Sequence, residues 1–338
     1  MREKPKLIVN IDSLPLKRFE IDLFVPDNYK IVNNETTKIR PTFSFLSEFL
    51  TGKPPSKTKI WVDYVISKSS PYWFLKWVKD FKVKDRNPIL RKILMTISKI
   101  ISKETYNPQN IPLGLLPFFD IDKNLKHFRE NVNKLFKEKF GTKSVSIISG
   151  DIYEVELGIR RSKQKLVFAN YSILDYVGHI FGPNSREYAE YTKKVFRSIR
   201  EVLSIGKFEE VQIMNDHGMY EIKKYIEIEP LLQEFKIGKD LIFFINSPML
   251  RFWILNKEVE KDLLDRLEEI KKWGKILEKK DYERFSFPKN RRFGEIIFWL
   301  HKGYHFLPDF FWGWKKIKGM HGYLEFERGK KITLKLLD

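Results

Sequence analysis

Three histidines and three aspartates lie beside glycine in short, loop-like segments of this sequence. They are Asp12, Asp175, His179, Asp216, His217 and His321. Neutral imidazole and carboxylate groups are good ligands for Zn²⁺ and related divalent ions. Six such ligands are too many for one tetrahedral ion but suit two. Two ions about 4 Å apart can clamp the attacking and leaving oxygens of an in-line phosphoryl transfer.

Composition narrows the chemistry further. The 338 residues include no cysteine, which excludes disulfides and thiolate metal sites and fits a cytoplasmic protein. The net charge of +19 favours anionic partners, although a lysine-rich thermophile surface explains the excess equally well. The N-terminus shows no apolar segment typical of a signal peptide. The remaining histidines, at positions 127, 301 and 305, are interpreted as surface or packing residues.

The elements that must position these side chains are four short apolar runs, each predicted to be a buried strand. They are Lys6–Ile11, Leu166–Ala169, Val211–Met214 and Leu241–Ile245. Asp12 directly follows the first run, and Asp216 and His217 follow the third. In open α/β sheets, ligands bind outside the carboxyl ends of the strands. The sequence therefore predicts that these polar residues meet at one edge of a sheet.

Helical patterns separate the predicted strands. Ser185 is a suitable N-cap for a helix over Arg186–Leu203, and Gly206 is suited to end it. A second helix is expected over Glu258–Trp273, with leucines along one face. Strands that alternate with helices indicate a layered α/β fold.

Residues 61–140 differ from the rest because basic and aromatic residues alternate there without a strand–helix rhythm. We interpret them as a helical insertion that covers the active-site edge, and Ile89–Ile101 as a basic amphipathic helix. Residues 1–60 and 141–338 then form the catalytic α/β core. The aromatic side chains of the insertion are expected to be core residues, with a surface for lipid- or glycan-linked phosphate as the alternative.

The motifs together resemble those of the type I phosphodiesterase/nucleotide pyrophosphatase family of the alkaline phosphatase superfamily. Residues 175–185 read DYVGHIFGPNS, similar to the family's D-x-x-G-H-x-x-G-P-x-S, and residues 215–219 read NDHGM. Segments RPTF at 40–43, TGKPP at 51–55 and HGY at 321–323 follow the family's order. The resemblance covers residues 6–55 and 165–323 and leaves the insertion unmatched.

This resemblance implies a role for each matching residue. One ion would be bound by Asp175, His179 and His321. The other ion would be bound by a second set of ligands, namely Asp12, Thr42, Asp216 and His217. Thr42 would be the nucleophile, because its alignment with the family needs no gap; Ser44 is the alternative.

Two positions depart from the family pattern. Phe45 occupies the place where nucleotide-cleaving members usually carry a phosphate-contacting Asn. Thr58, Lys59 and Ile60 replace the usual H-G-I. These departures affect the expected phosphate pocket and substrate choice, and leave the metal ligands unchanged.

The resemblance thus predicts an alkaline-phosphatase-like three-layer α/β/α sandwich with a helical insertion. The expected function is that of a metal-dependent phosphoric ester hydrolase, similar to phosphodiesterases. It would use two divalent ions, with Zn²⁺ expected first and Mn or Fe as alternatives.

The rival hypotheses are a phosphomonoesterase or phosphotransferase, and a non-catalytic binder of lipid- or glycan-linked phosphate. A small-molecule or carrier-linked phosphate ester is the expected partner rather than nucleic acid, and peripheral membrane contact stays open. A sulfatase is disfavoured because no Cys or S-x-P-x-R nucleophile segment is present.

Overall fold

The computed structural model of this chain describes most of its residues. They are residues 4–38, 40, 42–77, 89, 92–93, 96–97, 100, 110–324 and 328–337. The chain divides into two units, each built from segments distant in sequence. Unit 1 comprises Met1–Lys53, His127–Ile222 and Ile317–Asp338, and unit 2 comprises Pro54–Lys126 and Lys223–Lys316.

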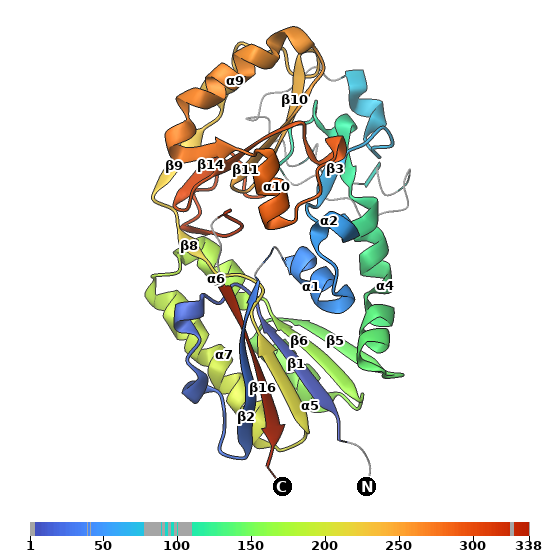
Figure 1. Cartoon of the computed structure of the whole chain (residues 1–338), viewed down its shortest axis with the longest axis vertical. Coiled ribbons are helices and arrows are strands. Elements are labelled where there is room, and N and C mark those ends of the chain that lie inside the picture. The colour runs from blue at the N-terminus through green and yellow to red at the C-terminus, as the bar shows by residue number, and fades with distance from the viewer. Residues whose placement is uncertain are drawn as a thin grey trace. The chain divides into compact units, whose positions relative to one another are not determined.

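Unit 1 is organised around a six-stranded sheet (Figure 1). Its strands, in spatial order, are β2 (Tyr29–Lys38), β16 (Arg328–Leu336), β7 (Glu210–Met214), β1 (Lys6–Ile11), β6 (Leu166–Tyr171) and β5 (Val145–Gly150). Strands β7, β1, β6 and β5 are parallel, whereas β16 pairs antiparallel with both β7 and β2. The carboxyl ends of β7, β1 and β6 therefore lie at the same edge, as the sequence predicts.

Alternate residues of these strands face opposite sides of the sheet. Leu7, Val9 and Ile11 point to one side and join a buried core with α5 (Ile152–Arg161) and α7 (Arg186–Ser204). Phe168 faces the other side, where its ring lies 4.8 Å from that of Phe136 on α4 (Lys123–Phe140). Helices thus cover both faces, and the predicted α/β/α layering is confirmed.

Local sequence signals explain where the helix α7 begins and ends, and two further helices lie near the sheet edge. α7 begins where predicted, because the Ser185 side chain accepts a hydrogen bond from the Tyr188 backbone N–H (3.1 Å). Gly206, with φ of 67°, follows the helix in the left-handed region that favours glycine. α6 (Ile173–Phe181) starts directly after β6, and α1 (Thr42–Thr51) lies between β2 and the end of the first segment of unit 1.

Unit 2 contains a separate four-stranded antiparallel sheet in the order β10 (Leu241–Asn246), β11 (Met249–Ile254), β13 (Ile296–Leu300) and β12 (Gly274–Ile276). The run Leu241–Ile245 is therefore a strand, but it does not join the central sheet as a fourth parallel strand. A tight turn at Asn246–Met249, with Ser247 at φ of 58°, folds β10 back onto β11. Short-range hairpin pairing, invisible in the hydrophobic run itself, decides its partner.

Smaller elements complete the chain. In unit 2, α2 (Pro55–Thr58), α8 (Glu229–Leu232), α9 (Glu260–Glu269) and α10 (Lys279–Phe285) accompany two strand pairs, β3 (Tyr64–Ile66) with β4 (Phe119–Ile121) and β14 (Tyr304–Leu307) with β9 (Lys224–Glu227). In unit 1, β8 (Tyr220–Glu221) pairs with β15 (Gly319–Met320). Within the described residues, no helix combines the length and apolarity that crossing a membrane requires.

The two units differ from the expected boundaries of the insertion. Unit 2 joins Pro54–Lys126 with Lys223–Lys316, whereas the last residues of the expected insertion, from His127, belong to unit 1. Trp61 illustrates the first difference, because its ring stacks on Phe287 at 4.5 Å and lies 6.0 Å from Trp299. The expected helix over Ile89–Ile101 lies mostly outside the described residues; those of its positions that are described are helical.

Candidate metal centre

The residues expected to bind metal gather at the carboxyl edge of the central sheet, all within unit 1. Asp12 follows β1, and Asp216 and His217 lie two and three residues beyond β7. The remaining candidate ligands come from other elements: Asp175 and His179 from α6, Thr42 from the first position of α1, and His321 from the residue after β15.

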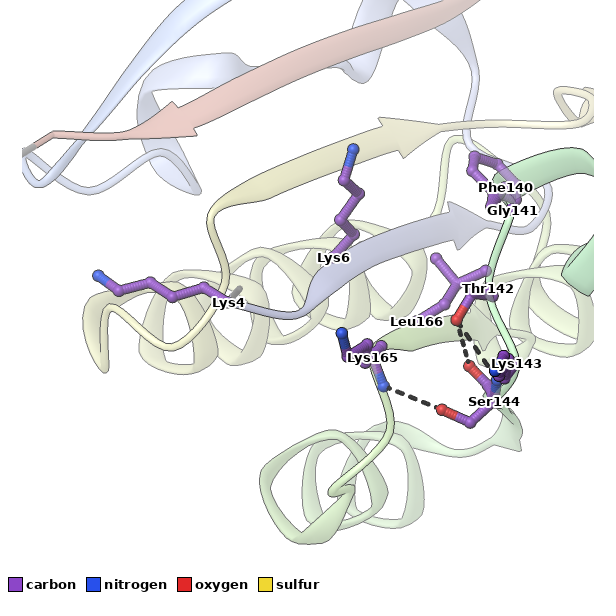
Figure 2. Close-up of a pocket in the computed structure, with 9 residues that line it drawn as sticks. All are labelled: Lys4, Lys6, Phe140, Gly141, Thr142, Lys143, Ser144, Lys165 and Leu166. Atoms are coloured by element: carbon purple, nitrogen blue, oxygen red, sulfur yellow. Dashed lines mark hydrogen bonds between the residues drawn. The ribbon is translucent and has the colours of Figure 1, made fainter. Parts of the chain in front are cut away.

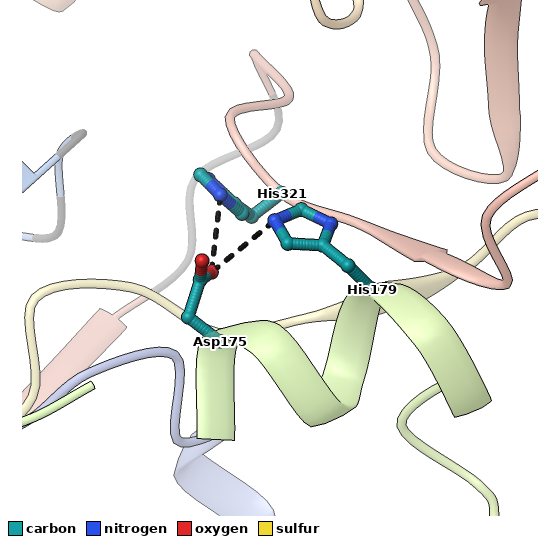
Figure 3. A group of neighbouring side chains, drawn as sticks. All are labelled: Asp175, His179 and His321. Carbon is teal, nitrogen blue, oxygen red and sulfur yellow. Dashed lines mark ion pairs between the residues drawn. The ribbon is translucent and has the colours of Figure 1, made fainter. Parts of the chain in front are cut away.

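Asp175, His179 and His321 form the first cluster (Figure 3). The Oδ1 atom of Asp175 lies 3.4 Å from Nε2 of His179 and 3.3 Å from Nε2 of His321. Asp175 and His179 are four residues apart on α6, so both side chains project from the same face of the helix. Two imidazole nitrogens and one carboxylate oxygen thus converge on one point.

Asp12, Asp216 and His217 form the second cluster, and Thr42 adjoins it. Nε2 of His217 lies 3.3 Å from Asp12 Oδ1, 3.6 Å from Asp216 Oδ2 and 3.3 Å from the Thr42 hydroxyl. All three cluster residues are buried, whereas Thr42 is partly exposed. The Thr42 hydroxyl therefore lies on the solvent-exposed side of the second cluster.

The two clusters are neighbours. The rings of His217 and His321, one from each cluster, stack with centroids 3.9 Å apart and planes 15° apart. The ring of His179 lies 5.1 Å from that of His321. The two clusters therefore adjoin and form one continuous set of candidate metal ligands.

Backbone carbonyls orient two of the imidazoles. Nδ1 of His179 lies 2.9 Å from the Gly319 carbonyl oxygen, and Nδ1 of His217 lies 3.2 Å from that of Gly218. A carbonyl only accepts, so in each ring Nδ1 carries the proton and Nε2 is left with a lone pair. Such second contacts are typical of metal-binding histidines, whose tautomer they fix.

Asp216 is held in a comparable way. Its Oδ1 atom accepts hydrogen bonds from the backbone N–H groups of Ser13 (3.3 Å) and His217 (3.0 Å). Ser13 adopts a positive φ of 65°, and its carbonyl oxygen accepts a hydrogen bond from the Tyr188 hydroxyl (2.5 Å). A positive φ at a non-glycine residue is uncommon and costs free energy, so the surrounding contacts hold this loop in place.

The unsatisfied atoms of the centre match a bound cation. Asp12 Oδ1, Asp175 Oδ1 and Asp216 Oδ2 are buried and make no hydrogen bond. Each of these oxygens faces an imidazole nitrogen of its own cluster. Buried polar atoms without a partner are costly, and a divalent ion between oxygen and nitrogen would satisfy them. The donor set, carboxylate and imidazole without thiolate, fits Zn²⁺ and related ions.

The shifted pKa values of Asp12 and His321 also support a metal-binding site. Burial, followed by repulsion from the carboxylates of Asp216 and Asp175, raises the pKa of Asp12 well above its ordinary value. Burial, followed by repulsion from the nearby His217 imidazole, lowers the pKa of His321 to about 4. At neutral pH, His321 is consequently a neutral imidazole, the form that binds a metal ion.

Two glycines allow these loops to approach each other. A Cβ atom on Gly319 would lie 2.3 Å from the carbonyl oxygen of Gly178, and one on Gly178 would lie 2.9 Å from the Met219 side chain. The strand β15, which precedes His321, therefore packs directly on α6, which carries His179. The glycine in the D-x-x-G-H motif is explained by this close contact.

The structure separates the two nucleophile candidates. Thr42 is partly exposed and adjoins the second cluster, whereas Ser44 is buried, with 2% of its surface exposed. Phe45 is also buried and stacks on Phe49 with ring centroids 6.4 Å apart. The position at which relatives are expected to carry a phosphate-contacting Asn therefore contributes to packing here.

Other polar residues lie outside the clusters or were not anticipated. His127 and His301 are exposed, and buried His305 pairs with Asp309 at 2.7 Å in unit 2. Asn10 donates a hydrogen bond to Asn170 (2.7 Å). The sequence did not indicate the carbonyl groups that orient the imidazoles, because a residue of any type supplies one.

Comparison with known proteins gives one family match and several structures of similar fold. The family profile described as Type I phosphodiesterase / nucleotide pyrophosphatase matches residues 26–324. No curated protein sequence matches this chain. Among solved structures, murine ectonucleotide pyrophosphatase / phosphodiesterase 5 is similar with a TM-score of 0.60 at 15% identity, over 97% of this chain and 87% of that one.

Two further structures share the fold. An inactive variant of the same murine protein, in complex with AMP, has a TM-score of 0.57 at 14% identity, over 98% of this chain and 88% of that one. Phosphonoacetate hydrolase from Sinorhizobium meliloti 1021, in complex with phosphonoformate, has a TM-score of 0.55 at 15% identity, over 98% and 90% of the respective chains.

Proposed function

The chain belongs to the type I phosphodiesterase/nucleotide pyrophosphatase family, and from this membership we propose that it hydrolyses phosphoric esters at a binuclear metal centre with Thr42 as nucleophile. The observation that supports the centre most directly is the pair of adjoining clusters whose buried carboxylate oxygens lack hydrogen bonds. A single ion would satisfy only one cluster.

The residues divide into two ligand sets. One ion would be held by Asp175, His179 and His321. The other would be held by Asp12, Asp216 and His217 together with the Thr42 hydroxyl. When bound, the ions supply Lewis acidity that lowers the pKa of the hydroxyl and stabilises charge on the phosphate oxygens.

The chain's own residues would then carry out two displacements. In the first, Thr42 Oγ1 attacks phosphorus; the new O–P bond forms as the bond to the leaving alcohol breaks. The threonine proton passes to solvent and the leaving oxygen gains one. In the second, water attacks the phosphothreonine and releases the phosphate product with Thr42 restored. The position of Thr42 at the start of α1 also places the developing negative charge at the positive end of a helix.

The proposed substrate class is based on the ligands of two similar structures and on the residue at position 45. Similar structures hold AMP and phosphonoformate, both small phosphorus-containing anions. We propose a small-molecule or carrier-linked phosphodiester, with Zn²⁺ as the first metal to test and Mn²⁺ or Fe as alternatives. Because Phe45 is packed inward, phosphate recognition would depend on the metal ions more than in relatives with Asn there.

The direct test counts bound metals and assays a chromogenic phosphodiester and phosphomonoester beside Thr42→Ala. We expect about two ions per chain, and diester turnover that falls by at least a thousandfold in the variant, on the order of the loss of a nucleophile. Ser44→Ala is the matched control, and we expect it to retain turnover.

Each other outcome has a defined meaning. Turnover lost in Ser44→Ala but kept in Thr42→Ala would move the nucleophile by two residues. A faster reaction with the monoester would favour a phosphomonoesterase on the same centre. Stoichiometric metal without turnover of either ester would contradict the proposed substrate class, and absence of metal binding would contradict the centre itself.

A further inference from the structure

A polar cavity lies in unit 1, at the amino ends of the central strands (Figure 2). Its volume is about 430 Å³. It is lined by residues from the chain start, from the loop after α4 and from the start of β6: Lys4, Lys6, Phe140, Gly141, Thr142, Lys143, Ser144, Lys165 and Leu166. Four of the nine lining residues are lysines, and none is acidic.

The lysines leave positive charge in the cavity. Lys6 Nζ lies 3.6 Å from a carboxylate oxygen of Glu210. Lys4 and Lys143 are exposed, and neither forms an ion pair with any carboxylate in the part of the chain that the structure describes. Lysine side chains along a cavity attract anions, most strongly where no carboxylate neutralises their charge.

Neutral groups add directional and apolar contacts. Ser144 Oγ accepts a hydrogen bond from the Lys165 backbone N–H (3.5 Å), and within the described residues its own proton has no acceptor. That hydroxyl can therefore donate to an oxygen of a ligand. Phe140 and Leu166 supply an apolar wall beside it. The cavity thus combines cations, a hydroxyl donor and a carbon surface.

This cavity is distinct from the metal centre. The cavity includes Lys6 and Leu166, the first residues of β1 and β6, whereas the metal ligands follow the last residues of β1 and β7. A strand of six residues spans about 20 Å. A ligand in the cavity would therefore lie on the opposite edge of the sheet and would not contact the ions.

We propose that the cavity beneath the C-terminal end of α4 is a second anion-binding site that takes a phosphate-bearing ligand. Its lysines neutralise the phosphate oxygens, Ser144 donates a hydrogen bond, and the apolar wall contacts the carbon part of the ligand. The same chemistry suits a soluble phosphate compound and an anionic lipid headgroup, which the experiment separates. The proposal does not depend on the catalytic role of Thr42.

The test measures binding of inorganic pyrophosphate by calorimetry, with the full chain kept in chelator so that the metal centre binds no anion through metal. The pocket variant combines Lys4→Gln and Lys143→Gln. The matched control, Lys257→Gln with Lys261→Gln, removes the same charge from exposed lysines of unit 2. Ser144→Ala tests the hydroxyl separately. A parallel flotation assay compares phosphatidylcholine vesicles with and without phosphatidylglycerol.

We expect the pocket variant to raise the Kd by about tenfold, the effect of losing charge-assisted contacts, and the control by less than about twofold. Loss of anionic-vesicle binding only in the pocket variant identifies a lipid headgroup; loss of pyrophosphate binding only identifies a soluble ligand. Equal weakening in both variants shows a net-charge effect and overturns the proposal. Absence of binding to both probes also overturns it.

Discussion

At the scale of single residues, Asp12 is a buried carboxylate that a bound cation would stabilise. Burial and the carboxylates of Asp216 and Asp175 oppose its ionisation, and its Oδ1 atom has no hydrogen bond. Without metal, the Asp12 carboxylate destabilises the folded chain at neutral pH, because its ionisation is easier in the unfolded state. With a divalent ion bound, the closely spaced carboxylates would act as its ligands. Asp12 would therefore favour metal binding while it lowers the stability of the metal-free protein.

Substituting Asp12→Asn separates the two effects. In chelator, we expect the variant to be more stable than the parent chain by about 1–2 kcal/mol, because one repelled carboxylate is gone. In Zn²⁺, we expect the order to reverse, since the parent gains about 3 kcal/mol from an ion present at a hundred times its Kd. Thermal unfolding under both conditions checks this. Equal shifts of the parent and the variant on adding metal would rule out Asp12 as a ligand.

His321 gives a pH prediction for the metal-free chain. Burial and the neighbouring His217 lower its pKa to about 4, below the ordinary 6.5. The unfolded chain therefore binds more protons than the folded chain between these values, so stability is present above pH 6.5 and is lost as pH falls through about 4. At about 1.4 kcal/mol per pKa unit, the loss is at most about 3.5 kcal/mol. His321→Gln should flatten the slope of stability against pH in this window, and an unchanged slope would contradict the assignment.

At the scale of elements, Ser185 lies in the segment 175–185, which also contains the candidate ligands Asp175 and His179. Its own role is to cap a helix. Its side chain caps α7 through the Tyr188 N–H, and its hydroxyl donates to the Gly182 carbonyl (2.8 Å). We expect Ser185→Ala to lower stability by about 1 kcal/mol while metal content and turnover stay unchanged at low temperature. Ser185→Asp, which restores the cap, is the control. A loss of bound metal in Ser185→Ala would indicate a role beyond capping.

Gly319 tests the contact between β15 and α6. A methyl group there would meet the Gly178 carbonyl oxygen at 2.3 Å, so β15 and the following His321 must shift. We expect Gly319→Ala to destabilise the chain by about 1–3 kcal/mol and to weaken the first metal cluster, which contains His321, more than the second. Metal titration followed by calorimetry distinguishes the clusters. Lys318→Ala, at the exposed neighbouring position, should leave both unchanged.

The sequence predicts some elements well and others poorly, for physical reasons. The buried run Lys6–Ile11 is β1 residue for residue, and the cap and glycine signals place α7 to within one residue at its end. In contrast, β2 and β16 carry many polar and charged residues, so no hydrophobic period marks them. The partner of Leu241–Ile245 depends on a hairpin turn, and the hydrophobicity of the run carries no information about it.

At the scale of the whole molecule, every candidate metal ligand belongs to unit 1. Removing the ions should therefore act on one unit more than on the other, because a ligand stabilises only the structure whose unfolding releases it. We expect chelation to reduce amide hydrogen-exchange protection in β1, β6 and β7, while β10 and β11 of unit 2 change little. Equal loss of protection in both units would show that they unfold as one cooperative body.

The grouping of the candidate ligands was more predictable than the division into units. Spaced motifs such as DYVGHIFGPNS indicate candidate ligands whatever segments lie between them, and the structure brings Asp12, Asp175 and His321 to one edge of the sheet. The grouping of Pro54–Lys126 with Lys223–Lys316 depends on contacts between distant segments, such as Trp61 on Phe287. Such pairings leave no periodic trace in a single sequence.

The place of β16 within the sheet has a consequence for biosynthesis. This strand, residues 328–336, lies between β2 and β7, so it joins a strand made early in translation to one made much later. Until the ribosome has released β16, both neighbours present unpaired backbone edges, which are templates for aggregation. The central sheet is therefore complete only after β16 has been made, and we expect a chain that lacks residues 328–336 to aggregate more readily than the 338-residue chain.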